Sequence, residues 1–180
     1  MARQSDRRDC PIGTAHGRLR ANQHASSRYT HYPSRTLPFC LMRADFYLID
    51  KPRFREQPLL LVCELARKAF AAQQPTLILA RDVEQAEALD ELLWAFDEDA
   101  MIPHQLAGDD DDAQTAVLVV PPDMTTPDRP LVINLRETCA PGNYQRVLEV
   151  VAAEPAEREG SRERWREYQR RGFELKKFDM

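Results

Sequence analysis

The sequence predicts an α/β fold: a single open, mostly parallel sheet flanked by helices, Rossmann-like in layout. Strand-like and helix-like segments alternate from residue 44 onward, and helical crossovers are the connections that parallel strands require. The short run 75–80 (PTLILA) is apolar without alternation, as in strands that a parallel sheet buries on both faces. At 180 residues, the chain fits one domain plus additional sequence.

The first half of the domain follows from local patterns. Residues 44–50 are aromatic and branched, which favours a strand, and Lys51-Pro52 ends it. Residues 57–73 have apolar side chains at helical spacing. After the strand at 75–80, Asp82 can cap a helix, with Gln85 at the capping-box position. We expect the inner face of this helix to consist of Ala86, Leu89, Leu93 and Trp94.

The second half is predicted in the same way. Residues 97–108 form a loop with a short extended piece around residues 101–103 (MIP), and strands follow at 116–120 and 130–135. Residues 143–147 resemble a helix and residues 148–152 an extended segment. A final helix covers residues 157–171, where Gly172 ends it.

Residues 1–41 differ from the rest of the chain and are predicted to be a disordered N-terminal extension. They lack hydrophobic periodicity and are rich in Arg, Ser, His and Pro. Three explanations remain open: a flexible tail, an organelle transit peptide, or upstream sequence included because the start codon was assigned too early. Met42, directly before the first strand, favours the last of these. The domain is therefore expected to span residues 42–180.

Charge and cysteine usage narrow the possible functions. Residues 1–41 hold seven arginines and two aspartates, a net charge of +5; since the whole chain carries −4, residues 42–180 carry −9. So acidic a domain is expected to repel phosphate backbones, which argues against extensive DNA binding. No apolar run reaches the roughly 20 residues that span a bilayer. The four cysteines are scattered, and Cys63 and Cys139 are expected to be small buried hydrophobes in a reducing cytoplasm.

Motifs for catalysis or cofactor binding are absent from the sequence. There is no phosphate-binding loop of the G-x-x-x-x-G-K-[ST] type and no G-x-G-x-x-G, so we expect no cofactor. Four adjacent carboxylates at Asp109–Asp112 could be read as a metal cluster, but neighbouring residues of an extended chain point in opposite directions, so a solvated acidic loop is expected. His104 lacks companion ligands, and a structural role is expected for it. An alternative hypothesis remains a metal-dependent nucleotide hydrolase that uses this acidic loop and His104.

The final helix carries the most informative pattern. Arg158, Arg162 and Arg166 lie four residues apart and form one row, with Trp165 and Tyr168 beside it. Guanidinium groups next to exposed aromatic rings suit a ligand that is both acidic and apolar. The alternative interpretation is a solvated helix face with Glu–Arg pairs at i,i+4 spacing.

Several segments together resemble the chi subunit (HolC family) of bacterial DNA polymerase III. They occur in the expected order between about residues 42 and 173, and residues 1–41 lie outside the resemblance. These segments are 46–50 (FYLID), 62–66 (VCELA), 89–94 (LDELLW), 103–108 (PHQLAG) and 162–173 (RERWREYQRRGF).

The resemblance implies a non-catalytic subunit of the clamp-loader assembly in DNA replication. It implies two protein partners, the psi subunit and the acidic C-terminal tail of single-stranded DNA-binding protein (SSB), and contact with DNA only indirectly. The SSB tail has aspartates followed by apolar residues and a terminal Phe. Carried over to this chain, the tail-binding residues are Val151, Arg158, Arg162, Trp165 (in place of the usual tyrosine) and Arg166.

For the psi subunit, the resemblance implies Met101, with Trp94 and His104 close to it in the sequence. A third hypothesis is a direct DNA-binding protein that uses the basic residues 1–41.

Overall fold

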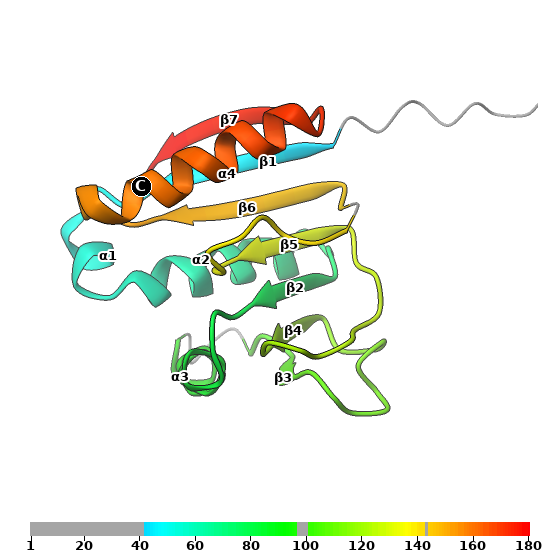
Figure 1. Ribbon diagram of the computed structural model, residues 1–180. Helices are drawn as coiled ribbons and strands as arrows, with labels where there is room; N and C mark the ends of the chain where they lie inside the picture. Colours follow the sequence, from blue (N-terminus) through cyan, green and yellow to red (C-terminus); the bar gives the residue numbers. More distant parts are fainter. Residues whose placement is uncertain (1–41, 97–100, 143) are drawn as a thin grey trace, which may run out of the picture. The chain divides into compact units, whose positions relative to one another are not determined.

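The computed structural model describes residues 42–96, 101–142 and 144–180, which form an α/β domain around one seven-stranded sheet (Figure 1). The strand order is β3-β4-β2-β5-β6-β1-β7, and all neighbouring strands run parallel. The predicted fold class is confirmed. The extension predicted for residues 1–41 lies outside the described residues.

The elements follow one another in the order β1-α1-α2-β2-α3-β3-β4-β5-β6-η1-α4-β7. The strands are β1 (Arg43–Leu48), β2 (Thr76–Leu79), β3 (His104–Leu106), β4 (Val117–Val120), β5 (Leu131–Asn134), β6 (Arg146–Val151) and β7 (Glu174–Asp179). The helices are α1 (Pro52–Glu56), α2 (Pro58–Ala71), α3 (Val83–Ala95), the 3₁₀ turn η1 (Pro155–Glu157) and α4 (Arg158–Arg170). The predicted cap of α3 is present, because the Asp82 carboxylate accepts a hydrogen bond from the Gln85 N–H at 2.7 Å.

The two faces of the sheet are covered differently. One hydrophobic cluster joins α1, α2 and α3 to the sheet and includes Phe54, Leu61, Leu89 and Ile133. A second cluster, on the other face, joins α4 to the strands beneath it and contains Phe46 and Tyr168. Helix α4 crosses from β6 to β7 over β1, which lies between these two strands (Figure 1). This crossover brings the final helix against the first strand.

The last strand, β7, has no counterpart in the sequence prediction. It pairs with β1 at the edge of the sheet, with Phe46 opposite Lys177 and Tyr47 opposite Phe178. It is an edge strand with β1 as its neighbour in the sheet, and its residues are exposed or half-buried. Its sequence, ELKKFD, therefore lacks the apolar run by which the central strands were recognised.

Two local predictions were wrong. The helix predicted at residues 143–147 is instead, in its described part, the approach to β6 and its first two residues, Arg146 and Val147. Val147 and Leu148 are buried in the sheet, and tertiary burial of this branched segment overrides the weak helical pattern. The extended piece predicted around Met101 lies slightly later, where His104 begins β3.

Two side chains, Trp94 and Cys139, lie in surroundings that differ from the prediction. Trp94 is 61% exposed rather than on the inner face of α3, whereas Ala86, Leu89 and Leu93 are buried there as expected. Of the two internal cysteines, Cys63 is buried as predicted, and burial raises the pKa of its thiol to about 12. Cys139 is only half-buried.

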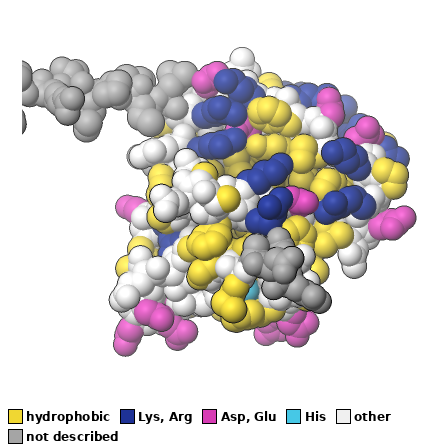
Figure 2. Space-filling model, turned by 180° about the vertical axis from the view of Figure 1, so that it is seen from behind, with side chains coloured by type: hydrophobic (Ala, Val, Ile, Leu, Met, Phe, Trp, Pro, Cys, Tyr) yellow, Lys and Arg dark blue, Asp and Glu magenta, His cyan; other side chains and the backbone are white. Residues whose placement is uncertain are grey.

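The net charge of −9 for residues 42–180 is not evenly distributed. Figure 2 shows the face opposite to the one in Figure 1, where Lys and Arg side chains gather among hydrophobic ones and acidic side chains lie mostly toward the margins. A net charge computed from the sequence therefore does not describe the potential at any one site.

Candidate functional site

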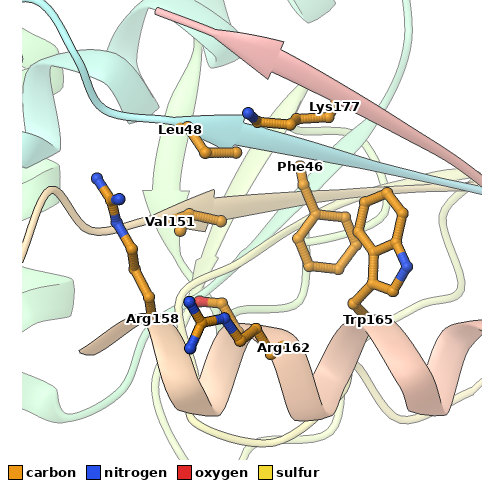
Figure 3. Close-up of a pocket in the computed structure, with 8 residues that line it drawn as sticks. Phe46, Leu48, Val151, Arg158, Arg162, Trp165 and Lys177 are labelled. Carbon is orange, nitrogen blue, oxygen red and sulfur yellow. The ribbon is translucent and has the colours of Figure 1, made fainter. Parts of the chain in front are cut away.

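A pocket of about 420 Å³ lies between α4 and the strands β1, β6 and β7 (Figure 3). It combines an apolar floor with cationic side chains from two elements. Its lining residues are Phe46, Leu48, Val151, Arg158, Ser161, Arg162, Trp165 and Lys177.

The floor of the pocket is apolar because strand alternation directs Phe46 and Leu48 of β1 to the α4 face of the sheet. Val151, the last residue of β6, continues this floor and is buried. The Trp165 indole packs at a tilt on the Phe46 ring, with centroids 4.8 Å apart. Trp165 is half-buried, so one part of the indole belongs to the core while another part forms a wall of the pocket.

The cationic side chains come from both sides of this floor. Arg158 and Arg162, one helical turn apart, project from α4, and Lys177 extends from β7 (Figure 3). Arg162 contacts Glu159 at 2.8 Å, with side chains 64% and 58% exposed respectively. Ion pairs this exposed contribute little stability, so the Arg162 guanidinium is available to a ligand.

The structure brings four of the five predicted tail-binding residues together at this pocket: Val151, Arg158, Arg162 and Trp165. Arg166 is exposed on α4, one turn beyond Arg162, and does not line the pocket. Four further lining residues, Phe46, Leu48, Ser161 and Lys177, were not predicted from the sequence. Alternation within the predicted first strand could have placed Phe46 and Leu48 on one face, whereas Lys177 lies on a strand that was not predicted.

Tyr168 was expected to be exposed beside the arginine row, and this was wrong because its side chain is fully buried. Its hydroxyl donates to the buried Glu149 carboxylate at 2.8 Å and accepts the Ala140 N–H, also at 2.8 Å. Glu149 also accepts hydrogen bonds from Arg164 Nε at 2.8 Å and from the Asn134 amide at 2.7 Å. This buried polar cluster attaches α4 to β5 and β6 and so fixes the wall of the pocket.

Burial raises the pKa of the Glu149 carboxyl, while the positive charge of Arg164 opposes the rise. Burial likewise raises the pKa of the Tyr168 phenol, and the adjacent Glu149 raises it further. All buried side-chain polar atoms in the described part of the chain have hydrogen-bond partners. The cluster is therefore a satisfied structural unit rather than a reactive group.

The residues predicted for the psi subunit lie on α3 and at the approach to β3. Trp94 and His104 are in contact, with ring centroids 4.7 Å apart, and Met101 is 74% exposed. The His104 ring is buried, with Nδ1 2.6 Å from the Ile102 carbonyl oxygen and Nε2 3.1 Å from that of Asp90. His104 thus holds the loop to α3, the structural role expected for it, and Trp94 and Met101 offer apolar surface to solvent.

The acidic segment 109–112 is only partly the solvated loop that was expected. Asp112 is buried and accepts the Gly108 N–H at 2.9 Å and the Gln105 amide at 2.8 Å. Arg129 donates to the Asp112 carbonyl oxygen. Within the described residues, no group of three or more His, Cys, Asp or Glu side chains is arranged to hold a metal ion. The carboxylates needed for the hydrolase alternative therefore do not converge in this part of the chain.

In the part of the chain that the structure describes, none of the helices has the length and apolar character needed to cross a membrane.

The fold of this domain is also found in solved structures. The domain resembles the bacteriophage T4 UvsW structure, with a TM-score of 0.55 and 8% identity over 78% of this chain. It also resembles Saccharomyces cerevisiae Dbp5 in a complex with Nup159 and Gle1, with a TM-score of 0.53 and 11% identity over 77% of this chain. The match spans 42% of each of those longer chains, and at such low identity it shows the fold alone.

Sequence comparison is more specific. Residues 41–176 match the family described as DNA polymerase III chi subunit, HolC. The chain is 38% identical over 141 residues to the DNA polymerase III subunit chi of Pseudomonas aeruginosa, covering 75% of this chain and 94% of that protein. It is 31% identical over 144 residues to the subunit chi of Escherichia coli, covering 75% and 96% respectively. The chain therefore belongs to the DNA polymerase III chi subunit family.

Proposed function

We propose that this protein is a non-catalytic accessory subunit of the cytoplasmic DNA polymerase III clamp-loader complex that captures the acidic C-terminal tail of SSB. The observation that supports this most directly is the pocket on α4, where an apolar floor and a tryptophan wall lie beside two arginines and a lysine. Such a site matches a peptide that ends in an aromatic residue and carries acidic residues before it. Contact with DNA is then indirect, through SSB.

In the proposed complex, each part of the tail has its own contact. The terminal Phe ring enters the pocket between Trp165 and Val151. Arg162 binds the terminal carboxylate, which its planar guanidinium can hold with two hydrogen bonds. Arg158 at the pocket and Arg166, one turn beyond Arg162 on α4, attract the upstream aspartates.

The size of the contact sets the expected affinity. One charge-assisted hydrogen bond contributes about 1.5–3 kcal/mol, and burial of an aromatic side chain contributes roughly 1.5–3 kcal/mol. After the cost of association, a micromolar dissociation constant is expected for one tail, about −8 kcal/mol. Several tails on SSB-coated DNA would raise the effective affinity through avidity.

A separate surface is proposed for the psi subunit. Trp94 and Met101 expose large apolar side chains, which is typical of a surface that a protein partner covers. His104 packs against the Trp94 ring and holds it in place. This surface lies on α3 and the approach to β3, whereas the tail pocket is formed by α4, β1, β6 and β7, so one chi subunit could bind both partners at once.

The central experiment compares two peptides. A synthetic acidic peptide that ends in Phe is titrated with the full chain and followed by fluorescence anisotropy, next to the same peptide amidated at its C-terminus. We expect micromolar binding of the free acid and at least tenfold weaker binding of the amide, because amidation removes the charge that Arg162 recognises. Equal binding of the two peptides, or none of either, would contradict the proposal.

A further inference from the structure

We propose that Lys177 of β7 binds a second anion of the ligand, so that the pocket selects a chain end with an acidic side chain shortly before its terminal aromatic residue. This inference rests on the proposed function and adds a residue that the arginine row of α4 does not include. In this inference, the acidic side chain nearest to the terminal residue of the ligand binds Lys177 rather than Arg166.

The geometry follows from the register of the last two strands of the sheet. Lys177 is the partner of Phe46 in the parallel pairing of β1 with β7. Because paired residues share a face, Lys177 points to the α4 side, above the floor of the pocket. Figure 3 shows its chain extending over Leu48, on the opposite side of the floor from Arg162. A ligand in the pocket therefore lies between a cationic helix and a cationic strand.

The positive charges that line the pocket favour the binding of a second anion. Its eight lining residues include three cationic side chains, Arg158, Arg162 and Lys177, and no carboxylate. A single terminal carboxylate bound by Arg162 would leave Lys177 across the floor without a ligand anion. An acidic side chain from the preceding residues would complete the charge complementarity.

Lys177 is available for such a contact. Its ammonium lies 3.2 Å from the Asp179 carboxylate, but the two side chains are 54% and 67% exposed. An ion pair this exposed is weak, so a ligand carboxylate can replace Asp179. Arg166, in contrast, does not line the pocket, and its effect on a ligand is expected to be long-range and sensitive to salt.

The test uses a neighbouring lysine as its control. Lys176 carries the same charge, but it alternates to the other face of the sheet and pairs with Glu174 at 3.0 Å. We would measure binding of the acidic Phe-terminated peptide to the wild type and to the Lys177→Gln, Lys176→Gln and Arg166→Gln variants at low and moderate salt. A matching peptide with asparagine in place of its aspartates completes the set.

We expect Lys177→Gln to weaken binding of the acidic peptide about three- to tenfold, as for one partly exposed ion pair. Lys176→Gln is expected to stay within about twofold of the wild type, and Arg166→Gln to lie between the two and to lose its effect as salt increases. With the asparagine peptide, the difference between Lys177→Gln and the wild type is expected to disappear.

An equal loss for Lys176→Gln and Lys177→Gln would reduce the effect to overall charge and overturn the inference. So would a Lys177→Gln effect that persists with the asparagine peptide. Failure of the wild type to bind the acidic peptide would instead reject the proposed function itself, so the two results can be told apart.

Discussion

Two arginines on α4, only two residues apart, have opposite surroundings. Arg164 faces the sheet, where its side chain is 12% exposed and contacts the fully buried Glu149 carboxylate at 2.8 Å. Arg162 faces the pocket, where its side chain is 64% exposed and contacts the Glu159 carboxylate, which is similarly open to solvent. The first arginine joins the helix to the sheet and the second is free for a ligand, so the same side chain has a structural role on one side of α4 and a proposed binding role on the other.

The two arginines differ because the carboxylates that they contact have different surroundings. Glu149 lies on β6, in the interior of the sheet, and its charge must be compensated where no water reaches it. Glu159 lies on α4 itself, in solvent, where either side chain is readily hydrated. The cost of removing an arginine therefore depends on whether a buried charge loses its partner.

The sharpest test of this comparison is the stability of an Arg164→Met variant. Because it leaves the buried Glu149 carboxylate without its cation, we expect the free energy of unfolding to fall by about 3–5 kcal/mol. Urea denaturation followed by circular dichroism measures this loss. Arg166→Met is the matched control, since Arg166 is exposed, and it is expected to change stability by less than about 0.5 kcal/mol. If the two variants had similar free energies of unfolding, Arg164 would not have the structural role described here.

The opposite outcome is expected for Arg162→Ala. Binding of the acidic Phe-terminated peptide should weaken tenfold or more, about 1.4 kcal/mol, because the proposed partner of the terminal carboxylate is lost. The stability of the folded domain should stay nearly unchanged, since the side chain is exposed. Anisotropy titration and thermal unfolding of the same preparation test both statements. Retained binding would remove Arg162 from the site.

A smaller effect of opposite sign is expected for Glu159→Gln. The variant removes the carboxylate that contacts Arg162 at 2.8 Å and competes with the ligand. We expect peptide binding to become about two- to fivefold tighter, the range of an exposed ion pair. Glu163→Gln is the control, because Glu163 is also exposed on α4 but, among the described ion pairs, is not a partner of Arg162. Weaker binding by Glu159→Gln would show that Glu159 supports the site rather than competing with the ligand.

The smallest effect concerns pH. None of the eight described residues that line the pocket is a histidine, the side chain that ordinarily titrates near neutrality. The carboxyl groups of the peptide are already ionised above about pH 5. Peptide affinity should therefore stay within about twofold between pH 6 and pH 8 at constant ionic strength. A marked change over this interval would indicate a titrating group that the pocket geometry does not include.

The fold was largely predictable because most of its elements have strong local patterns. The apolar runs of β2, β4 and β5 and the Asp82 cap of α3 are visible in the sequence alone. β7 was missed because an edge strand with only one neighbouring strand needs no apolar run. The helix predicted at residues 143–147 failed because the burial of Val147 in β6 depends on strands far away in the sequence.

From residue spacing alone, the candidate site could be predicted only where its residues share one element, and Val151 of β6 was assigned to it through the family resemblance. The four-residue spacing of Arg158 and Arg162 is a property of α4, and it was recognised from the sequence. The roles of Arg164 and Tyr168 depend on Glu149, which precedes them by 15 and 19 residues and meets them only through the sheet. The position of Lys177 over Phe46 depends in the same way on the pairing of the first and last strands.

The pairing of β1 between β6 and β7 also has a consequence for synthesis on the ribosome. Phe46 and Leu48 are among the first residues of the domain to emerge, whereas Trp165 and Lys177 are among the last. A nascent chain that ends before α4 contains the floor residues of the pocket but lacks Trp165 and Lys177. The pocket is therefore complete only when translation of the domain is almost finished.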